Sequence, residues 1–209
     1  MTARARMAIV CLMASVLLTG CGSSPSVRYF SLSSTVTGSA RNADDAVVLG
    51  LGPMRIAEYL NRPQMVTRGE GSEVLVDEFS RWAEPLEQAV HRTVATDIDH
   101  LMDGVTVIVF PWESAVQDQI DYRLLGEISH FDADATGRVV LETQWSVVAA
   151  QRGDLVVQPR RTRYEVSGKS PVDPAAVALA MSEALAMFSN DIAGKLQAVI
   201  KAQVDPAGG

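Results

Sequence analysis

The sequence predicts an α+β fold, a single domain in which a mostly antiparallel or mixed β-sheet carries two amphipathic helices on one face. Several short segments alternate apolar and polar residues, which is the period of a half-buried strand. Two longer segments repeat apolar residues every three or four positions, which is the period of a helix. Helices placed on one face of a sheet bury both kinds of apolar surface.

The chain begins with a segment that has the pattern of an export signal. Arg4 and Arg6 precede an apolar run over 7–18, which ends in the letters LTGC at Cys21. This order is typical of a secretory signal, and the run is shorter than the roughly 20 residues of a membrane-spanning helix. The four letters resemble the bacterial lipobox, which implies cleavage before Cys21 and acylation of that cysteine. An ordinary secretory signal or a short membrane anchor is the alternative interpretation.

This pattern predicts four segments. They are a lipoprotein signal peptide over 1–20, a lipidated N-terminus and tether over 21–26, a folded domain over 27–203 and a disordered tail over 204–209. Acyl chains on Cys21 would tether the protein to a bilayer without spanning it. The residue after Cys21 is Gly22, whereas an aspartate at this position retains many bacterial lipoproteins at the inner membrane. Similarity to sorted lipoproteins therefore favours the periplasmic face of the outer membrane.

Cleavage also changes the thiol and charge content. Cys11 leaves with the signal and Cys21 is acylated, which excludes a disulfide framework, a cysteine nucleophile and a thiolate metal site. Loss of two arginines lowers the basic count from 18 to 16 against 25 acidic residues, giving a mature net charge of −9. An acidic chain repels phosphate backbones, so we expect no nucleic-acid partner.

The first half of the domain reads mainly as strands. "VRYFSL" is rich in strand formers, and the polar residues 33–45 indicate a loop. "AVVLGLGPMRI" predicts a strand interrupted by Pro53, and "RPQMVTRG" with "SEVLVDEFSRWA" predicts two strands around a turn at Gly69-Glu70-Gly71.

A helix is predicted over 84–102, with Pro85 as its first helical residue. Its apolar stripe consists of Leu86, Val90, Val94, Ile98 and Leu101. The stripe places Val94 in the core, so a charge there should be damaging, whereas Thr93 one position around the helix should accept a charge more easily.

The second half continues with strands and ends in a helix. "VTVIVFPW" is short and continuously apolar, which predicts a buried strand. Three segments follow across "DADATG" and "QRG", and they predict an antiparallel meander. The last segment, over 173–200, predicts a long helix capped by Asp173 with Pro174 next.

Three stretches of the domain resemble a known family. "RYFSL" after the lipobox, "YLNRPQMVTR" and "FSRWAEPLEQAV" are similar to the ABC-type transport auxiliary lipoproteins, the PqiC-like proteins associated with MCE lipid-transport systems. The resemblance implies a non-catalytic accessory subunit without a cofactor. It also implies an MCE-domain partner beside an inner-membrane transporter, a role in lipid transport and envelope integrity, and self-association into a ring as a further option.

The family-like stretches contain the candidate partner-interface residues Tyr59, Arg62, Arg81 and Trp82. Tryptophan and arginine are typical anchors of protein interfaces. Trp82 stands at the junction of strand and helix, where it could equally be a core residue.

Two groups of residues resemble metal sites but have simpler interpretations. Asp132, Asp134, Thr136 and Gly137 match the start of a calcium loop, but its twelfth position is Thr143 in place of glutamate, which favours a polar hairpin turn. His91 and His100 lie nine positions apart on one helix and point to opposite sides, so they cannot share an ion.

The basic residues Arg160, Arg161 and Arg163, with Arg152 nearby, could face anionic lipid headgroups or an acidic partner. Strand alternation separates Arg160 from Arg161 and Arg163, which favours a solvated sheet face.

Two further function classes remain open. A lipid-binding carrier would need an apolar cavity of several hundred Å³. An envelope hydrolase is a weaker alternative, because the sequence has no G-x-S-x-G elbow and no convincing metal-ligand constellation.

Overall fold

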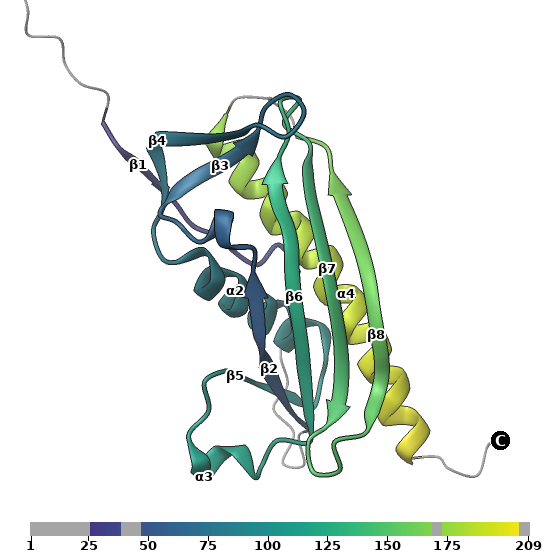
Figure 1. Ribbon diagram of the computed structural model, residues 1–209. Coiled ribbons are helices and arrows are strands. Elements are labelled where there is room, and N and C mark those ends of the chain that lie inside the picture. Colours follow the sequence, from purple (N-terminus) through teal and green to yellow (C-terminus); the bar gives the residue numbers. More distant parts are fainter. Residues whose placement is uncertain (1–25, 39–46, 169–172, 205–209) are drawn as a thin grey trace, which may run out of the picture.

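Eight strands form one mixed sheet in the computed structural model, which describes residues 26–38, 47–168 and 173–204 (Figure 1). The strands are β1 (Arg28–Phe30), β2 (Val47–Ile56), β3 (Gln64–Arg68), β4 (Val74–Trp82), β5 (Val105–Val109), β6 (Tyr122–Ala133), β7 (Val139–Ala149) and β8 (Leu155–Val166). Two long helices pack on this sheet, so the predicted α+β class is confirmed. Residues 1–20, Cys21, most of the predicted tether, part of the loop over 33–45 and residues 205–209 lie outside the described residues.

Strand β6 is the central strand of the sheet. β7 pairs with it antiparallel along its whole length and β8 pairs with β7, which confirms the predicted meander. The other side of β6 is shared by two strands: β2 runs parallel to its first half, and β3 meets it at the single pair Thr67–Ala133. The sheet therefore divides on that side into two branches.

The two branches differ in how they are attached. In one, β5 pairs parallel with β2, which is bonded to β6 over several residues. In the other, β4 pairs antiparallel with β3, and β1 pairs parallel with β4 at the edge. A short 3-10 helix, η1 (Glu58–Leu60), connects β2 to β3. We call the strands β1, β4 and β3 the N-terminal branch.

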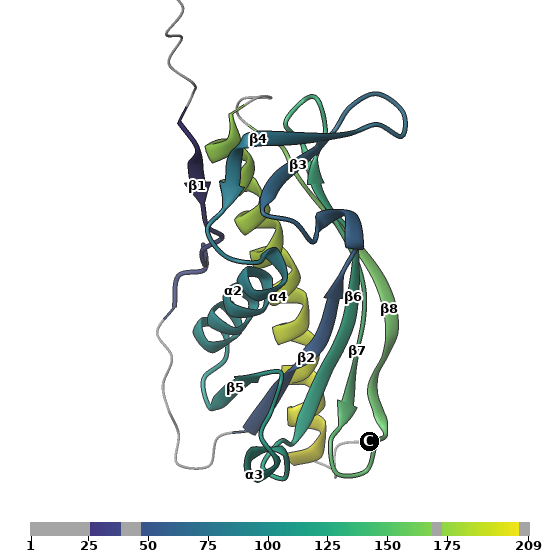
Figure 2. The ribbon, with the colours of Figure 1, turned by 60° about the vertical axis from the view of Figure 1, so that its left-hand side comes forward.

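Helices α2 (Leu86–Leu101) and α4 (Pro174–Val204) cover one face of the sheet (Figure 2). They contact each other as well as the strands. α4 is long and apolar enough to cross a membrane, but 61% of its most apolar window is buried inside the domain, as in the core helix of a folded protein. A short helix, α3 (Ser114–Gln117), lies between β5 and β6 and was not predicted.

The interruption expected at Pro53 is present as a register shift between Leu51 and Met54, after which the ladder of β2 resumes. Two other expectations are corrected. β5 is an edge strand with only its first residue buried, so it is not the buried strand expected there. Pro85 precedes α2 as its N-cap residue.

The buried surface of α2 is wider than its apolar stripe suggests. Val94 is fully buried, as expected, but Thr93 is also 0% exposed. Thr93 and Asp97 are buried where α2 lies near α4, so a charge at position 93 would not be tolerated and that expectation was wrong.

Asp97 is a carboxylate in the core between the two helices. Its side chain is 0% exposed, and its Oδ2 accepts a hydrogen bond from Ser189 Oγ of α4 at 3.1 Å. Its Oδ1 has no hydrogen-bond partner among the described residues. Burial raises the pKa of Asp97 above its usual value, and the hydrogen bond from Ser189 only partly opposes the effect.

This carboxylate should make stability fall as the pH rises. The pKa of Asp97 is higher in the folded protein than in the unfolded chain, because burial disfavours the charged carboxylate. The contribution of Asp97 to stability is therefore fully present below the unfolded-state pKa near 3.8, and it is lost as the pH rises through the folded-state pKa. We expect Asp97→Asn to be more stable than the parent protein at pH 7, with the difference shrinking on acidification towards pH 4. Thermal unfolding of both proteins across this range measures the difference. A constant difference would contradict it.

Candidate functional site

The two most specific family-like stretches meet in space on the N-terminal branch. β3 and β4 pair antiparallel with Gln64 opposite Arg81, and the Trp82 amide donates to the Pro63 carbonyl oxygen at 2.7 Å. A groove of about 330 Å³ lies at this junction. It is lined by Asn61, Arg62, Pro63, Trp82, Ala83, Glu84 and Pro85. We call it the 62/82 groove.

The groove is lined by apolar and charged side chains. Trp82 is 5% exposed and belongs to the hydrophobic core, so it both plugs the core and forms part of the groove. Arg62 is exposed. Glu84 is held by Arg92, whose Nη2 lies 2.6 Å from the Glu84 Oε1 and also donates to the Leu32 carbonyl oxygen at 2.8 Å. The site can therefore accept an apolar group flanked by charge.

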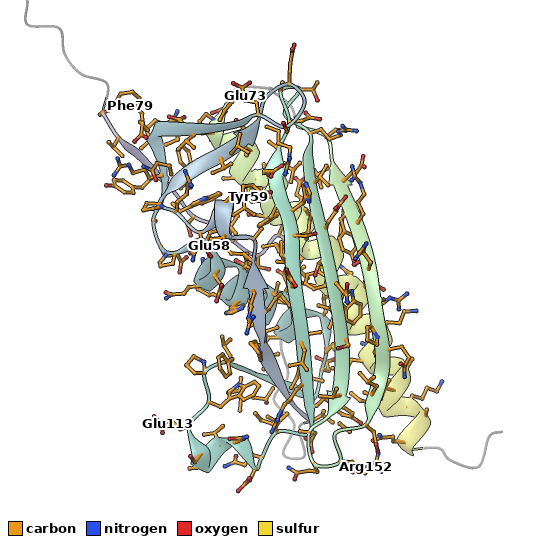
Figure 3. All side chains as sticks on the ribbon, viewed as in Figure 1. Glu58, Tyr59, Glu73, Phe79, Glu113 and Arg152 are labelled. Carbon is orange, nitrogen blue, oxygen red and sulfur yellow. The ribbon has the colours of Figure 1, made fainter. Side chains whose placement is uncertain are left out.

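The structure does not place all four candidate interface residues together. Arg62 and Trp82 line the groove, whereas Arg81 is not one of its lining residues. Arg81 Nε donates to the Glu78 carbonyl oxygen at 3.3 Å, and its Nη2 lies 3.7 Å from the Glu78 carboxylate. Tyr59 lies apart from the groove, beside β6 (Figure 3).

Tyr59 belongs to a polar cluster with Arg68 and Asp132. The Tyr59 hydroxyl donates to Asp132 Oδ2, and Arg68 Nε donates to Asp132 Oδ1 at 2.9 Å. Arg68 Nη2 also donates to the Tyr59 oxygen at 3.0 Å, with its guanidinium 5.6 Å from the ring centroid. Burial and the neighbouring Asp132 carboxylate raise the pKa of Tyr59. The hydroxyl therefore stays protonated and acts as a hydrogen-bond donor.

This cluster joins η1 and β3 to the end of β6. The Asp132 side chain is 2% exposed and the Arg68 side chain 27%, so the cluster is mostly shielded from water. The sequence did not indicate Arg68 as a candidate residue. Asp132 was considered only as a calcium ligand. Asp132 falls inside β6, before the turn, and a carboxylate at a strand position was the signal that could have indicated a buried partner.

The "DADATG" segment forms the predicted hairpin turn between β6 and β7. Asp134 Oδ1 accepts from the Thr136 amide at 2.8 Å, and Arg138 Nη2 lies 3.0 Å from Asp134 Oδ2. Partial burial acts to raise the pKa of Asp134, but these hydrogen bonds outweigh it and hold the pKa below its usual value. Over the described residues, no group of three histidine, cysteine or acidic side chains could hold a metal ion.

His91 and Arg160 are engaged in structural contacts. His91 is buried, with Nε2 2.8 Å from the Met54 carbonyl oxygen. Arg160 lies over the Trp145 ring at 5.6 Å, on the face opposite to the exposed residues Arg161 and Arg163. The predicted division of these arginines between two faces is confirmed.

Comparison with known families identifies the class of protein. The model of the family described as ABC-type transport auxiliary lipoprotein component matches residues 30–193. This match covers most of the chain, so the chain belongs to that family and is an auxiliary lipoprotein component of ABC-type transport systems. The name of the family implies anchoring to a membrane by lipid. A search of curated proteins found no match.

Solved structures support the same fold. A Xanthomonas campestris protein of family DUF330 is 20% identical with a TM-score of 0.66, and the match covers 86% of this chain and 99% of that one. An uncharacterized protein is also 20% identical, with a TM-score of 0.63 and coverage of 77% and 99%. A PelC dodecamer from Paraburkholderia phytofirmans matches at 13% identity and a TM-score of 0.41, over 73% and 90% of the two chains, which is too distant to support any argument.

We expect Tyr59→Phe to lower the free energy of unfolding by about 1–3 kcal/mol, because it leaves an oxygen of the buried Asp132 carboxylate without its hydrogen bond. Tyr29→Phe is the matched control, since Tyr29 is 66% exposed and should tolerate loss of its hydroxyl. Denaturant unfolding of the two variants measures the effect. Equal stabilities would show that the cluster contributes nothing to folding.

Proposed function

We propose that this protein is a non-catalytic accessory subunit of an MCE-type, ABC-linked system for lipid transport and envelope integrity, and that it acts through protein contacts at the 62/82 groove. The observation that carries the proposal is the convergence of two family-like stretches, twenty residues apart in sequence, on one exposed groove. Arg62 is exposed where it can meet a partner, and the buried Trp82 gives the groove an apolar lining residue held in the core.

The packing of the core favours an adaptor over a lipid carrier. A carrier needs an apolar cavity that shields acyl chains. The helix residues that would line such a cavity are used in contacts within the domain, since Val90, Val94, Phe188 and Ile192 are all 0% exposed. The groove itself opens to solvent and is bordered by charged side chains, which suits a protein segment better than a lipid tail.

The proposal includes the anchoring and the partner. Residues 1–20 are removed as a signal, Cys21 is acylated, and residues 21–26 tether the domain over 27–203 to the periplasmic face of the outer membrane. The partner is the MCE-domain protein of the same system, which works beside the inner-membrane transporter. Self-association of the domain would suit a tubular partner.

Charge reversal in the groove tests the contact. We expect Arg62→Glu to weaken co-purification with the MCE-domain protein by about tenfold, because an interface charge then opposes its partner's charge. Its melting temperature should stay unchanged, since Arg62 is exposed.

Arg152→Glu is the matched control for this experiment. The Arg152 side chain is 67% exposed and lies at the opposite end of the domain (Figure 3). Partner binding that is equally strong in both variants would exclude Arg62 from the interface, and loss of binding in both would indicate a general effect of charge.

Removal of the acylated cysteine tests the anchor. We expect Cys21→Ser to move the protein from the outer-membrane fraction to the periplasm or to retain it with an uncut signal, because the acyl-chain burial is lost. The melting temperature of the domain should not change. A processed variant that still fractionates with the outer membrane would show that acylation does not localise the protein.

A further inference from the structure

Exposed apolar side chains gather on the N-terminal branch. Of nine large apolar side chains that are exposed among the described residues, five lie in β4 or in and beside β1, which is far more than these short strands would hold by chance. They are Val27, Tyr29, Val74, Leu75 and Phe79. The proposed function uses none of these five residues.

Two of these side chains, Tyr29 and Phe79, share one face next to the point where the chain enters the fold. β1 and β4 are parallel, with Arg28 opposite Ser80 and Tyr29 opposite Arg81. Alternation along both strands then places Tyr29, Phe79 and Arg81 on one side, opposite to the buried Trp82, and the exposed Val27 directly precedes β1. Figure 3 shows Phe79 at this corner, beside β1. We call Tyr29, Phe79 and Arg81, together with Val27, the β1–β4 face.

The length of chain before this face limits what can cover it. Only five Cα-to-Cα steps separate Cys21 from Ser26, the first described residue. A fully extended chain covers about 3.6 Å per step, so Ser26 lies within about 18 Å of an acylated Cys21. The face therefore stays close to the bilayer whenever Cys21 is inserted in it.

We propose that the β1–β4 face rests on the surface of the bilayer that holds the anchor, so that the domain is oriented as well as tethered. This inference rests on the acylation of Cys21 in the proposed function. Tyr29 is 66% exposed and has an apolar ring with a polar tip, which suits the boundary between headgroups and acyl chains. Phe79 and Val27 supply apolar contact.

A cation on this face supports a lipid surface as the occupant. Arg81 lies on the β1–β4 face, opposite Tyr29, and its side chain is 35% exposed. Its guanidinium can reach headgroup phosphates while its stem covers apolar surface. Arg28 lies on the other side of β1, with its guanidinium 5.0 Å from the Phe30 ring. Glu78, the acidic neighbour in β4, lies 3.7 Å from Arg81 and partly offsets that charge.

A single thiol can report the contact in the acylated protein, because the mature chain has no other free cysteine. Phe79→Cys and the control Arg152→Cys are produced from the full precursor and labelled with an environment-sensitive fluorophore. Each is reconstituted in vesicles of phosphatidylethanolamine and phosphatidylglycerol, with and without lipids that carry a nitroxide on the headgroup. Intact mass establishes the acyl chains on Cys21.

We expect the nitroxide lipids to quench the label at position 79 and to leave the label at position 152 unchanged. Adding Tyr29→Glu to Phe79→Cys should reduce that loss of fluorescence without changing the melting temperature, since Tyr29 is exposed. Tyr29→Phe in the same background should keep the quenching.

Three results would overturn the inference. Equal quenching at the two positions in acylated protein would mean that the domain has no fixed orientation, and the proposed accessory role would be unaffected. A spectral shift at position 79 that grows with protein concentration, without nitroxide quenching, would assign the face to a second copy of the chain. Absence of acyl chains from Cys21 would overturn both this inference and the proposed anchor.

Discussion

The ion pair between Arg68 and Asp132, completed by the Tyr59 hydroxyl, is the interaction on which the N-terminal branch depends. β3 meets β6 through one residue pair, so the sheet ladder alone holds this branch weakly. A buried carboxylate is costly unless its oxygens are satisfied, and here Tyr59 and Arg68 each take one oxygen. The cluster thus fixes the position of the branch at a point where backbone pairing is sparse.

The two branches of the sheet differ in their roles: one is packed into the domain, and the other carries the proposed contact surfaces. The branch formed by β2 and β5 is bonded to β6 over several residues, and helix α2 packs against both of its strands. The N-terminal branch has fewer bonds to β6 and carries the 62/82 groove as well as the β1–β4 face. The two surfaces proposed for contact therefore both lie on the branch where the chain enters the domain, and the rest of the sheet supports that branch.

Local periodicity was sufficient to predict most elements of the fold. Apolar residues of β7, such as Leu141 and Trp145, alternate with polar ones, and the structure buries them as expected. Periodicity could not reveal that α2 is buried beyond its stripe at Thr93, because that depends on the position of α4. Parallel pairing of β2 with β6 was likewise beyond reach, since it depends on contacts between distant segments.

The candidate site was predicted only in part for the same reason. Arg62 and Trp82 came from resemblance of sequence stretches, and their meeting in one groove follows from the pairing of β3 with β4. Tyr59 lies in a family-like stretch too, but its partner Asp132 is 73 positions away. A sequence pattern cannot distinguish an aromatic residue that supports a surface from one that belongs to it.

The length of α4 gives the domain a direction. This helix packs against β1 near its start, where the Ser33 amide donates to Ser182 Oγ at 3.2 Å, and it ends at the opposite end of the domain (Figure 1). Its 31 residues span roughly 46 Å at 1.5 Å per residue. The helix thus sets a fixed distance between the end of the domain where the chain enters and the opposite end. A protein fused after Val204 would be held about one helix length from that entry point.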